Sequence, residues 1–164
     1  MNIFYLDHDV RKSVSYLVDK HVVKMPLETV QILSSSCHIH GMLSPYKPTH
    51  LKHPCVLWAA SSQNNYAWLL SYADLIFSEY TRRYGRVHAS QKHLDQLRKL
   101  DGVLVDVPFS LPPQCMPEHC RGSDTVEAYR RYYRTEKKHI HSWKTRCVPE
   151  WIAISKQDLY DRAL

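Results

Sequence analysis

No stretch of the 164-residue sequence approaches the roughly 18 consecutive apolar residues that a membrane-spanning helix needs. The first residues also lack the basic region and apolar segment of a secretory signal peptide. The chain contains neither an internal repeat nor a low-complexity linker. A hydrophobic fraction of 44% argues against disorder. We therefore expect one soluble domain over residues 1–164, located in the cytoplasm and not at a membrane.

Cysteine is present, but not in the even number and spacing of a disulfide framework. The five cysteines are Cys37, Cys55, Cys115, Cys120 and Cys147. An odd set of this kind indicates free thiols in a reducing compartment. Cys115, His119 and Cys120 resemble zinc ligands, but a structural zinc site needs a second pair, and none is correctly spaced. We predict no metal and no cofactor.

Basic residues outnumber acidic ones. Lys and Arg number 22 against 16 Asp and Glu, which gives a net charge of +6, and there are eleven His. A pI near 9.1 is compatible with a phosphate-bearing partner, DNA or a nucleotide, although many basic proteins bind nothing in particular. Oligomeric state leaves no mark in the sequence.

Caps, helix breakers and apolar spacing predict an all-α fold, a compact bundle of about five to six helices with a long proline-rich loop. The expected helices cover residues 9–18, 19–40, a stretch from about 54, 63–84, 90–100 and 123–144. Asp9, Asp19 and Ser62 are the expected N-caps, and Gly41 and Gly85 the expected ends.

Other segments are predicted from their prolines. Pro26 lies inside the second helix and predicts a kink there. Residues 103–122 have no helical period, so we expect a loop that wraps a surface or covers a site, with a brief strand at 103–107 as an option. We also expect Trp151 to anchor the chain and a final turn or two within residues 157–164.

The helix from Asp19 onward carries the main candidate site. At about 100° per residue, His21, Lys24 and Glu28 fall within an arc of roughly 60°, while apolar residues cover most of the remaining circumference. A narrow polar stripe on such a helix opens either onto water, as a solvated face, or into an internal cleft. The cleft would bring an imidazole, an ammonium and a carboxylate together.

That set of groups suits the cleavage of an N-glycosidic bond. Such a reaction needs a carboxylate to stabilise positive charge at the sugar C1′, a proton donor for the leaving base, and water or an amine as nucleophile. Glu28 can supply the first, and His21 or His50 the second. Lys24 can act as the amine only with a strongly lowered pKa, whereas the α-amine of Met1, near pKa 8 when unperturbed, starts closer to a useful value.

Basic side chains elsewhere are candidates for nucleic-acid or phosphate contacts. They are Lys47, Lys52, His53, Arg82, Arg83, Arg130, Arg134 and Lys137. In the last predicted helix they interleave with tyrosines, as a phosphate-tracking and base-stacking surface requires. An ordinary solvated basic face on a core helix has the same pattern.

Residues 15–21, with Glu28 seven residues after His21 on a continuing apolar helix, resemble the catalytic helix of the small T4-type pyrimidine-dimer DNA glycosylases with AP-lyase activity. The similarity covers roughly the first 85 residues. It implies an all-α enzyme in which the α-amine of the first residue attacks C1′ and a helix-borne glutamate is essential. Glu28 matches that glutamate, and His21 the histidine one helical face before it.

Some positions depart from the family pattern. Leu27 and Gln31 stand where the family has arginines beside its glutamate. The family exposes its nucleophile by removing Met, but Asn2 is too large for efficient removal, so the amine here would be that of Met1. Residues 2–7 and 19–25 also resemble uncharacterised phage-encoded proteins, which implies a phage origin and the host cytoplasm.

The leading hypothesis is a DNA glycosylase-like enzyme acting on an N-glycosidic bond, with AP-lyase activity as an option. One alternative is an enzyme or binding protein for free nucleotides in phage nucleotide metabolism or counter-defence. Another is a nucleic-acid-binding module without catalysis.

Overall fold

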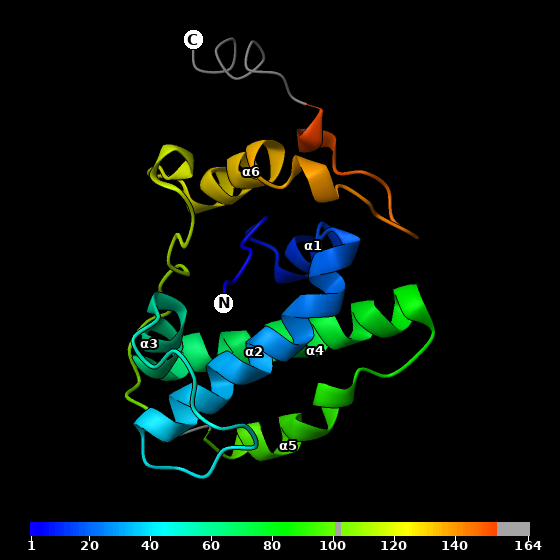
Figure 1. Cartoon of the computed structure of the whole chain (residues 1–164). Helices are drawn as coiled ribbons and strands as arrows, with labels where there is room; N and C mark the ends of the chain where they lie inside the picture. Colours follow the sequence, from blue (N-terminus) through cyan, green and yellow to red (C-terminus); the bar gives the residue numbers. More distant parts are fainter. Residues whose placement is uncertain (101–102, 154–164) are drawn as a thin grey trace.

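The computed structural model describes residues 1–100 and 103–153 (Figure 1). Its α-helices are α1 (Val10–Ser15), α2 (Asp19–Ile39), α3 (Pro54–Ala60), α4 (Gln63–Tyr84), α5 (Leu94–Leu97) and α6 (Thr125–Thr135). Short 3-10 helices are η1 (Ala89–His93), η2 (Arg98–Leu100), η3 (Glu118–Cys120), η4 (Lys138–Ile140) and η5 (Glu150–Ile152). These ranges include no strand, so the prediction of an all-α fold is confirmed.

Helix α2 lies at the centre, packed against α3 and α4 (Figure 1). Local capping sets the bounds of this core. The Ser62 hydroxyl accepts from the backbone N–H of Asn64 at 3.1 Å, and α4 ends at Gly85, whose φ of 67° needs a residue without a Cβ. Gly41, at φ 69°, follows the end of α2 in the same way. The helix continues through Pro26.

The first residues of the chain are buried although they form no helix. Residues 2–6 run between α6 and the pair α2–α4 (Figure 1). The Phe4 ring stacks on His21 of α2 with centroids 4.1 Å apart and meets Tyr133 of α6 edge-on at 5.4 Å. This packing fixes the position of the chain's α-amine.

The proline-rich loop wraps the start of α4. The carbonyl of Val105 accepts from the backbone N–H of Gln63 at 2.9 Å, and that of Val107 accepts from the Ser62 hydroxyl at 2.8 Å. The Trp58 indole donates to the Ser110 carbonyl at 3.0 Å. The loop prediction is confirmed, whereas the optional strand at 103–107 is not formed.

The helices predicted over 9–18 and 123–144 were too long, and the one predicted over 90–100 is interrupted. Helix α1 ends at Ser15. Helix α6 ends at Thr135 rather than near residue 144. Residues 136–153, named here the C-terminal strap, turn away because tertiary contacts hold them: Trp143 donates to the Tyr16 carbonyl at 2.9 Å, and Trp151 is buried. The predicted helix over 90–100 is instead the series η1, α5 and η2.

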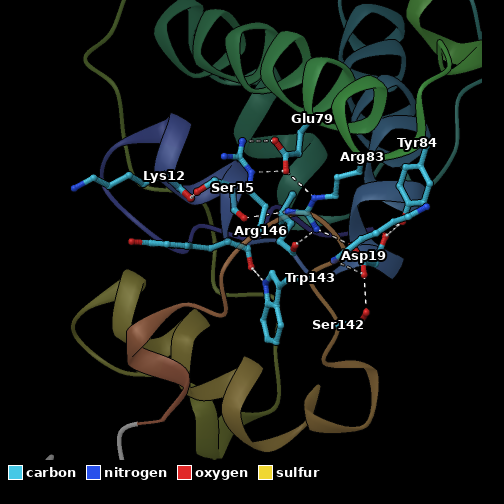
Figure 2. Close-up of polar contacts among 12 residues, drawn as sticks. Lys12, Ser15, Asp19, Glu79, Arg83, Tyr84, Ser142, Trp143 and Arg146 are labelled. Atoms are coloured by element: carbon cyan, nitrogen blue, oxygen red, sulfur yellow. Dashed lines mark hydrogen bonds and ion pairs between the residues drawn. The ribbon is translucent and has the colours of Figure 1, made fainter.

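Asp19 was predicted to be the N-cap of α2, but its side chain makes no cap hydrogen bond. It binds partners that are far away in sequence instead. It accepts from the Ser142 hydroxyl at 2.6 Å and from Arg83 at 3.0 Å. Figure 2 shows this polar network, named here the Arg83 cluster (Asp19, Glu79, Arg83 and Arg146), which ties the strap to α2 and α4.

None of the helices in the described part of the chain is long and apolar enough to cross a membrane. The final turn expected within residues 157–164 lies outside the described residues.

Candidate active site

Helix α2 turns Glu28 into the protein and Lys24 out of it. The Glu28 side chain is 12% exposed, against 62% for Lys24, and Val23 and Leu27 also lie on the exposed side. The polar stripe therefore lies partly inside and partly outside the protein. The Glu28 carboxylate faces the interior, and the Lys24 ammonium approaches it from the solvent side, with Nζ 2.9 Å from Oε1.

The α-amine of Met1 lies on the inner side of Glu28. Its nitrogen is 3.8 Å from Glu28 Oε2, and the Met1 side chain is 3% exposed. An amine and a carboxylate 27 positions apart in sequence thus face each other. We name the group formed by Met1, Lys24, Glu28 and Tyr72 the Met1 cluster.

Asn2 holds the amine in place. Its Nδ2 donates to the Cys115 carbonyl at 2.8 Å, and its Oδ1 lies 2.8 Å from the hydroxyl of Tyr129, which can donate to it. The same Oδ1 accepts from the backbone N–H of Ile3 at 2.8 Å. The residue after Met1 is thereby fixed to both the proline-rich loop and α6.

Two polar atoms of the Met1 cluster are buried without a hydrogen-bond partner. They are Glu28 Oε2 and the Tyr72 hydroxyl. Burial raises the pKa of Tyr72, and the charges of Glu28 and Cys55 raise it further, so the hydroxyl is neutral and lies near both groups. Buried polar atoms are normally paired, and the described core also leaves Thr29 Oγ1, Ser34 Oγ and Trp151 Nε1 unpaired. What sets the Met1 cluster apart is that its unpaired oxygens include a carboxylate oxygen 3.8 Å from an amine.

His21 is not placed to deliver a proton at Glu28. It is buried between Phe4 and α6, with Nδ1 2.6 Å from the Tyr133 hydroxyl. Burial, followed by the positive charges of Lys137 and Lys24, lowers the pKa of His21 to about 3. The ring is neutral at pH 7 and acts as a packed core histidine, which corrects the sequence interpretation.

Two other histidines, His53 and His50, lie near each other, and the charge of the amine acts on His53. Burial lowers the pKa of His53, and the charges of the Met1 amine and His50 lower it further, whereas Glu28 acts in the opposite direction. His53 also caps α3, because its Nδ1 accepts from the backbone N–H of Cys55 at 3.1 Å. His50 is exposed, and its Nδ1 lies 2.6 Å from the Thr49 hydroxyl.

Two cysteines complete the surroundings of the amine. Cys55 Sγ and Cys115 Sγ are 3.6 Å apart. The hydrogen bond from Cys55 lowers the pKa of Cys115 against the effect of burial, and the positive Met1 amine lowers it further. The three residues that resemble zinc ligands in the sequence, Cys115, His119 and Cys120, do not lie together, since Cys115 joins His53 and Cys55 while the other two lie beside Glu136.

The predicted phosphate contacts separate into exposed and engaged side chains. Lys47, Lys52 and Arg82 are exposed. The Arg83 side chain is fully buried in the Arg83 cluster, where a DNA phosphate cannot reach it.

The basic residues of α6 are engaged within the protein. Arg130 donates to Asp7 at 2.8 Å and lies over the Trp151 ring. Arg134 pairs with Glu127, and Lys137 lies over the Tyr132 ring. These side chains fasten the N-terminal segment and the strap, so the interpretation of this face as a phosphate-tracking surface does not fit the structure.

Sequence reasoning missed Asn2, Tyr72 and the pair Cys55–Cys115 as neighbours of the amine. Asn2 had one usable signal, a polar residue within an otherwise apolar opening segment. Tyr72 follows the apolar spacing of α4, and Cys115 lies in a loop without periodicity, so neither pattern pointed to Glu28.

A sequence profile described as pyrimidine dimer DNA glycosylase matches residues 1–93. The chain belongs to the pyrimidine dimer DNA glycosylase family. No curated protein and no solved structure matches the chain.

The part matched to the pyrimidine dimer DNA glycosylase family contains Met1, Glu28 and His53, and the T4-type resemblance is thereby confirmed. The family acts on DNA, which supports a glycosylase-like enzyme. Cys115 and the α6 residues that hold Asn2 lie outside the matched part.

Proposed function

We propose that this protein is a DNA glycosylase with AP-lyase activity, which acts on a damaged pyrimidine and uses the α-amine of Met1 as its nucleophile. The observation that carries the proposal is the 3.8 Å separation between that amine and the buried Glu28 carboxylate. Membership of the pyrimidine dimer DNA glycosylase family supports it.

The chemistry requires few groups. The neutral amine attacks C1′ of the damaged nucleotide, the bond between C1′ and the base breaks, and the sugar ring opens to a Schiff base on Met1. Loss of a proton from C2′ then breaks the C3′–O bond and cuts the strand. Glu28 can accept the proton of the Met1 ammonium and stabilise the positive charge that develops at C1′.

The remaining groups have supporting roles. Lys24 pairs with the outer oxygen of Glu28 and orients the carboxylate, rather than acting as a nucleophile. His53, on which the charge of the amine acts, and the exposed His50, whose charge acts on His53, are the candidates to protonate the leaving base. Exposed Lys47, Lys52 and Arg82 are the candidate phosphate contacts.

Borohydride trapping tests the amine route. Duplex DNA carrying either a pyrimidine dimer or an abasic site is incubated with the protein and borohydride, which reduces the Schiff base to a stable amine. We expect a covalent adduct whose sugar remnant maps to the peptide that begins at Met1. Intact mass establishes first that this α-amine is free.

Two variants sharpen the test. Glu28→Gln should reduce trapping and strand cutting by at least about 100-fold, the usual effect of removing such a stabilising group. Glu136→Gln removes an exposed carboxylate elsewhere and serves as the matched control. An adduct on a lysine, or full activity in Glu28→Gln, would contradict the proposal. DNA binding without any adduct or strand cutting in the parent protein would favour a binding module without catalysis.

A further inference from the structure

Three side chains with metal-ligand atoms meet beside the α-amine of Met1. The ligand atoms of His53, Cys55 and Cys115 all lie within 4.8 Å of one another. They come from the loop before α3, from α3 itself and from the proline-rich loop, so the fold rather than a local motif brings them together.

Their spacing suits a tetrahedral zinc ion. Zinc lies about 2.3 Å from a thiolate sulfur, which places two sulfurs of a tetrahedral site about 3.8 Å apart. The observed separation of Cys55 Sγ and Cys115 Sγ is 3.6 Å. A ring nitrogen about 2.0 Å from the same ion would lie roughly 3.5 Å from each sulfur, so only a small movement of His53 is needed.

We propose that His53, Cys55 and Cys115 bind a soft divalent cation, Zn²⁺ in the first instance, with the α-amine of Met1 as the fourth ligand. The positive charge of that amine acts on each of the three side chains, so the amine lies in their neighbourhood. Two thiolates neutralise the ion, and thiolates with imidazole are the ligands that zinc prefers.

His53 must change its hydrogen bonding when the ion binds. Its Nδ1 now accepts from the backbone N–H of Cys55, so in the neutral ring the proton sits on Nε2. Coordination through Nδ1 exchanges the cap of α3 for the metal. Partial exposure of His53 and Cys115 leaves the ion a route of entry.

A second group of ligand types serves as an internal comparison. His119, Cys120 and Glu136 also lie within 4.8 Å of one another, but His119 and Glu136 are exposed and already paired at 2.9 Å. That group has a single thiol and no fourth ligand beside it among the described residues, so we expect it to bind zinc far more weakly.

The proposed ion has a consequence for catalysis that rests on the proposed function. A zinc ion bound through the Met1 nitrogen occupies the lone pair that attacks C1′. Metal binding and Schiff-base formation then exclude each other, and zinc acts as a reversible inhibitor.

Cobalt(II) titration of the full-length protein tests the site without any substrate. The protein is kept reduced with a phosphine, and a thiol titration verifies all five cysteines as free before Co²⁺ is added. We expect one Co²⁺ per chain, with a thiolate-to-cobalt charge-transfer band and the visible bands of tetrahedral cobalt, both abolished by Zn²⁺.

Variants locate the site. Cys115→Ser, with circular dichroism to verify its fold, should weaken the affinity by roughly 100-fold and lose at least half of the charge-transfer intensity. His53→Ala should weaken it as well, and this variant keeps the test informative if Cys55→Ser does not fold. Cys147→Ser and His119→Ala are the matched controls and should bind as the parent does.

Two results would overturn the proposal: no charge-transfer band in the fully reduced protein, or an unchanged band in Cys115→Ser. A pair that forms a disulfide in air but binds no cobalt when reduced would be a redox pair, which also contradicts it. Trapping with and without Zn²⁺ keeps the two proposals separate, since a protein that binds cobalt but never traps DNA loses only the proposed function.

Discussion

The two buried glutamates of the described core, Glu28 on α2 and Glu79 on α4, differ in how their oxygens are used. Arg146 donates to both Glu79 oxygens, at 3.0 Å and 2.7 Å, and Arg83 Nε donates to one of them at 2.7 Å. Glu28 pairs closely only with the exposed Lys24, and its inner oxygen, 3.8 Å from the Met1 amine, has no hydrogen-bond partner. Both oxygens of Glu79 are hydrogen-bonded, whereas Glu28 can accept a further hydrogen bond at its inner oxygen.

This difference in hydrogen bonding separates charged groups that stabilise the fold from groups that can still accept hydrogen bonds. In the Arg83 cluster each charged group is paired with a group of opposite charge. Burial alone would raise the pKa of Glu79, but hydrogen bonds from Arg146 and Arg83 hold it below its ordinary value. In the Met1 cluster a carboxylate oxygen and a phenol hydroxyl are buried without hydrogen-bond partners beside an amine. Such an arrangement is costly for stability, and under the proposed function the substrate supplies the missing partners.

The largest effect is expected from breaking the Arg83 cluster. Arg83→Ala removes the donor to Glu79, Asp19 and the carbonyls of Leu17 and Ser15, and leaves buried acidic groups uncompensated. We expect a loss of about 3–5 kcal/mol in the free energy of unfolding, measured with urea. Arg98→Ala, which breaks an exposed pair with Asp74, is the control and should cost less than about 1 kcal/mol. Equal losses would mean that the cluster is not a structural unit.

The second prediction compares the two glutamates through the same change. Glu79→Gln should cost about 2–4 kcal/mol, because two guanidinium groups lose a charged acceptor. Glu28→Gln should change the free energy of unfolding by about 1 kcal/mol or less, since its inner oxygen makes no hydrogen bond to lose. Urea unfolding of both variants checks this contrast, and a reversed order would show that Glu28 is the structural residue.

The sequence predicted the central helices well because local signals define them. A serine cap, terminal glycines and Pro54 set the limits of α2, α3 and α4 to within about a residue. The end of α6 was wrong because nothing local stops it. The spacing of aromatic and basic residues continues to Trp143, and only the contacts of Ser142 and Trp143 with residues far away in sequence pull the chain off the helix.

The candidate site was predictable in part for the same reason. The position of Glu28 on α2 follows from helical spacing, and the role of the Met1 amine follows from the family resemblance. The burial of His21 and the approach of Asn2, Tyr72 and Cys115 depend on contacts between distant segments. Helical spacing groups residues on one helix, but it does not decide which of them turns inward.

His21 on α2 is a third buried titratable group to compare with the two glutamates, and it is neutral at pH 7. Its pKa is about 3 in the folded protein against about 6.5 when unfolded, so the unfolded chain binds the extra proton between these values. The contribution to stability is fully present above pH 6.5 and is lost as the pH falls. We expect a loss of up to about 1.4 kcal/mol per pH unit below 6.5, or about 2 kcal/mol by pH 5.

Urea unfolding from pH 7 to pH 5 measures this slope against a variant. His21→Asn keeps a polar atom near the Tyr133 hydroxyl but does not titrate, so its stability should depend less on pH by that amount. Identical slopes in both proteins would show that His21 is protonated in the folded state.

The smallest effect is expected at Lys24, the exposed member of the Met1 cluster. Its side chain is 62% exposed, so the ion pair with Glu28 is screened by water, and Lys24→Ala should change the free energy of unfolding by less than about 1 kcal/mol. Because the amine of Met1 rather than that of Lys24 is the proposed nucleophile, borohydride trapping should survive in Lys24→Ala, with the adduct still on the first peptide. Lys12→Ala, an exposed lysine on α1, is the control for net charge. Loss of the adduct in Lys24→Ala alone would identify Lys24 on α2 as the nucleophile. The Met1 amine would then be a structural partner of Glu28, much as Arg83 is of Glu79.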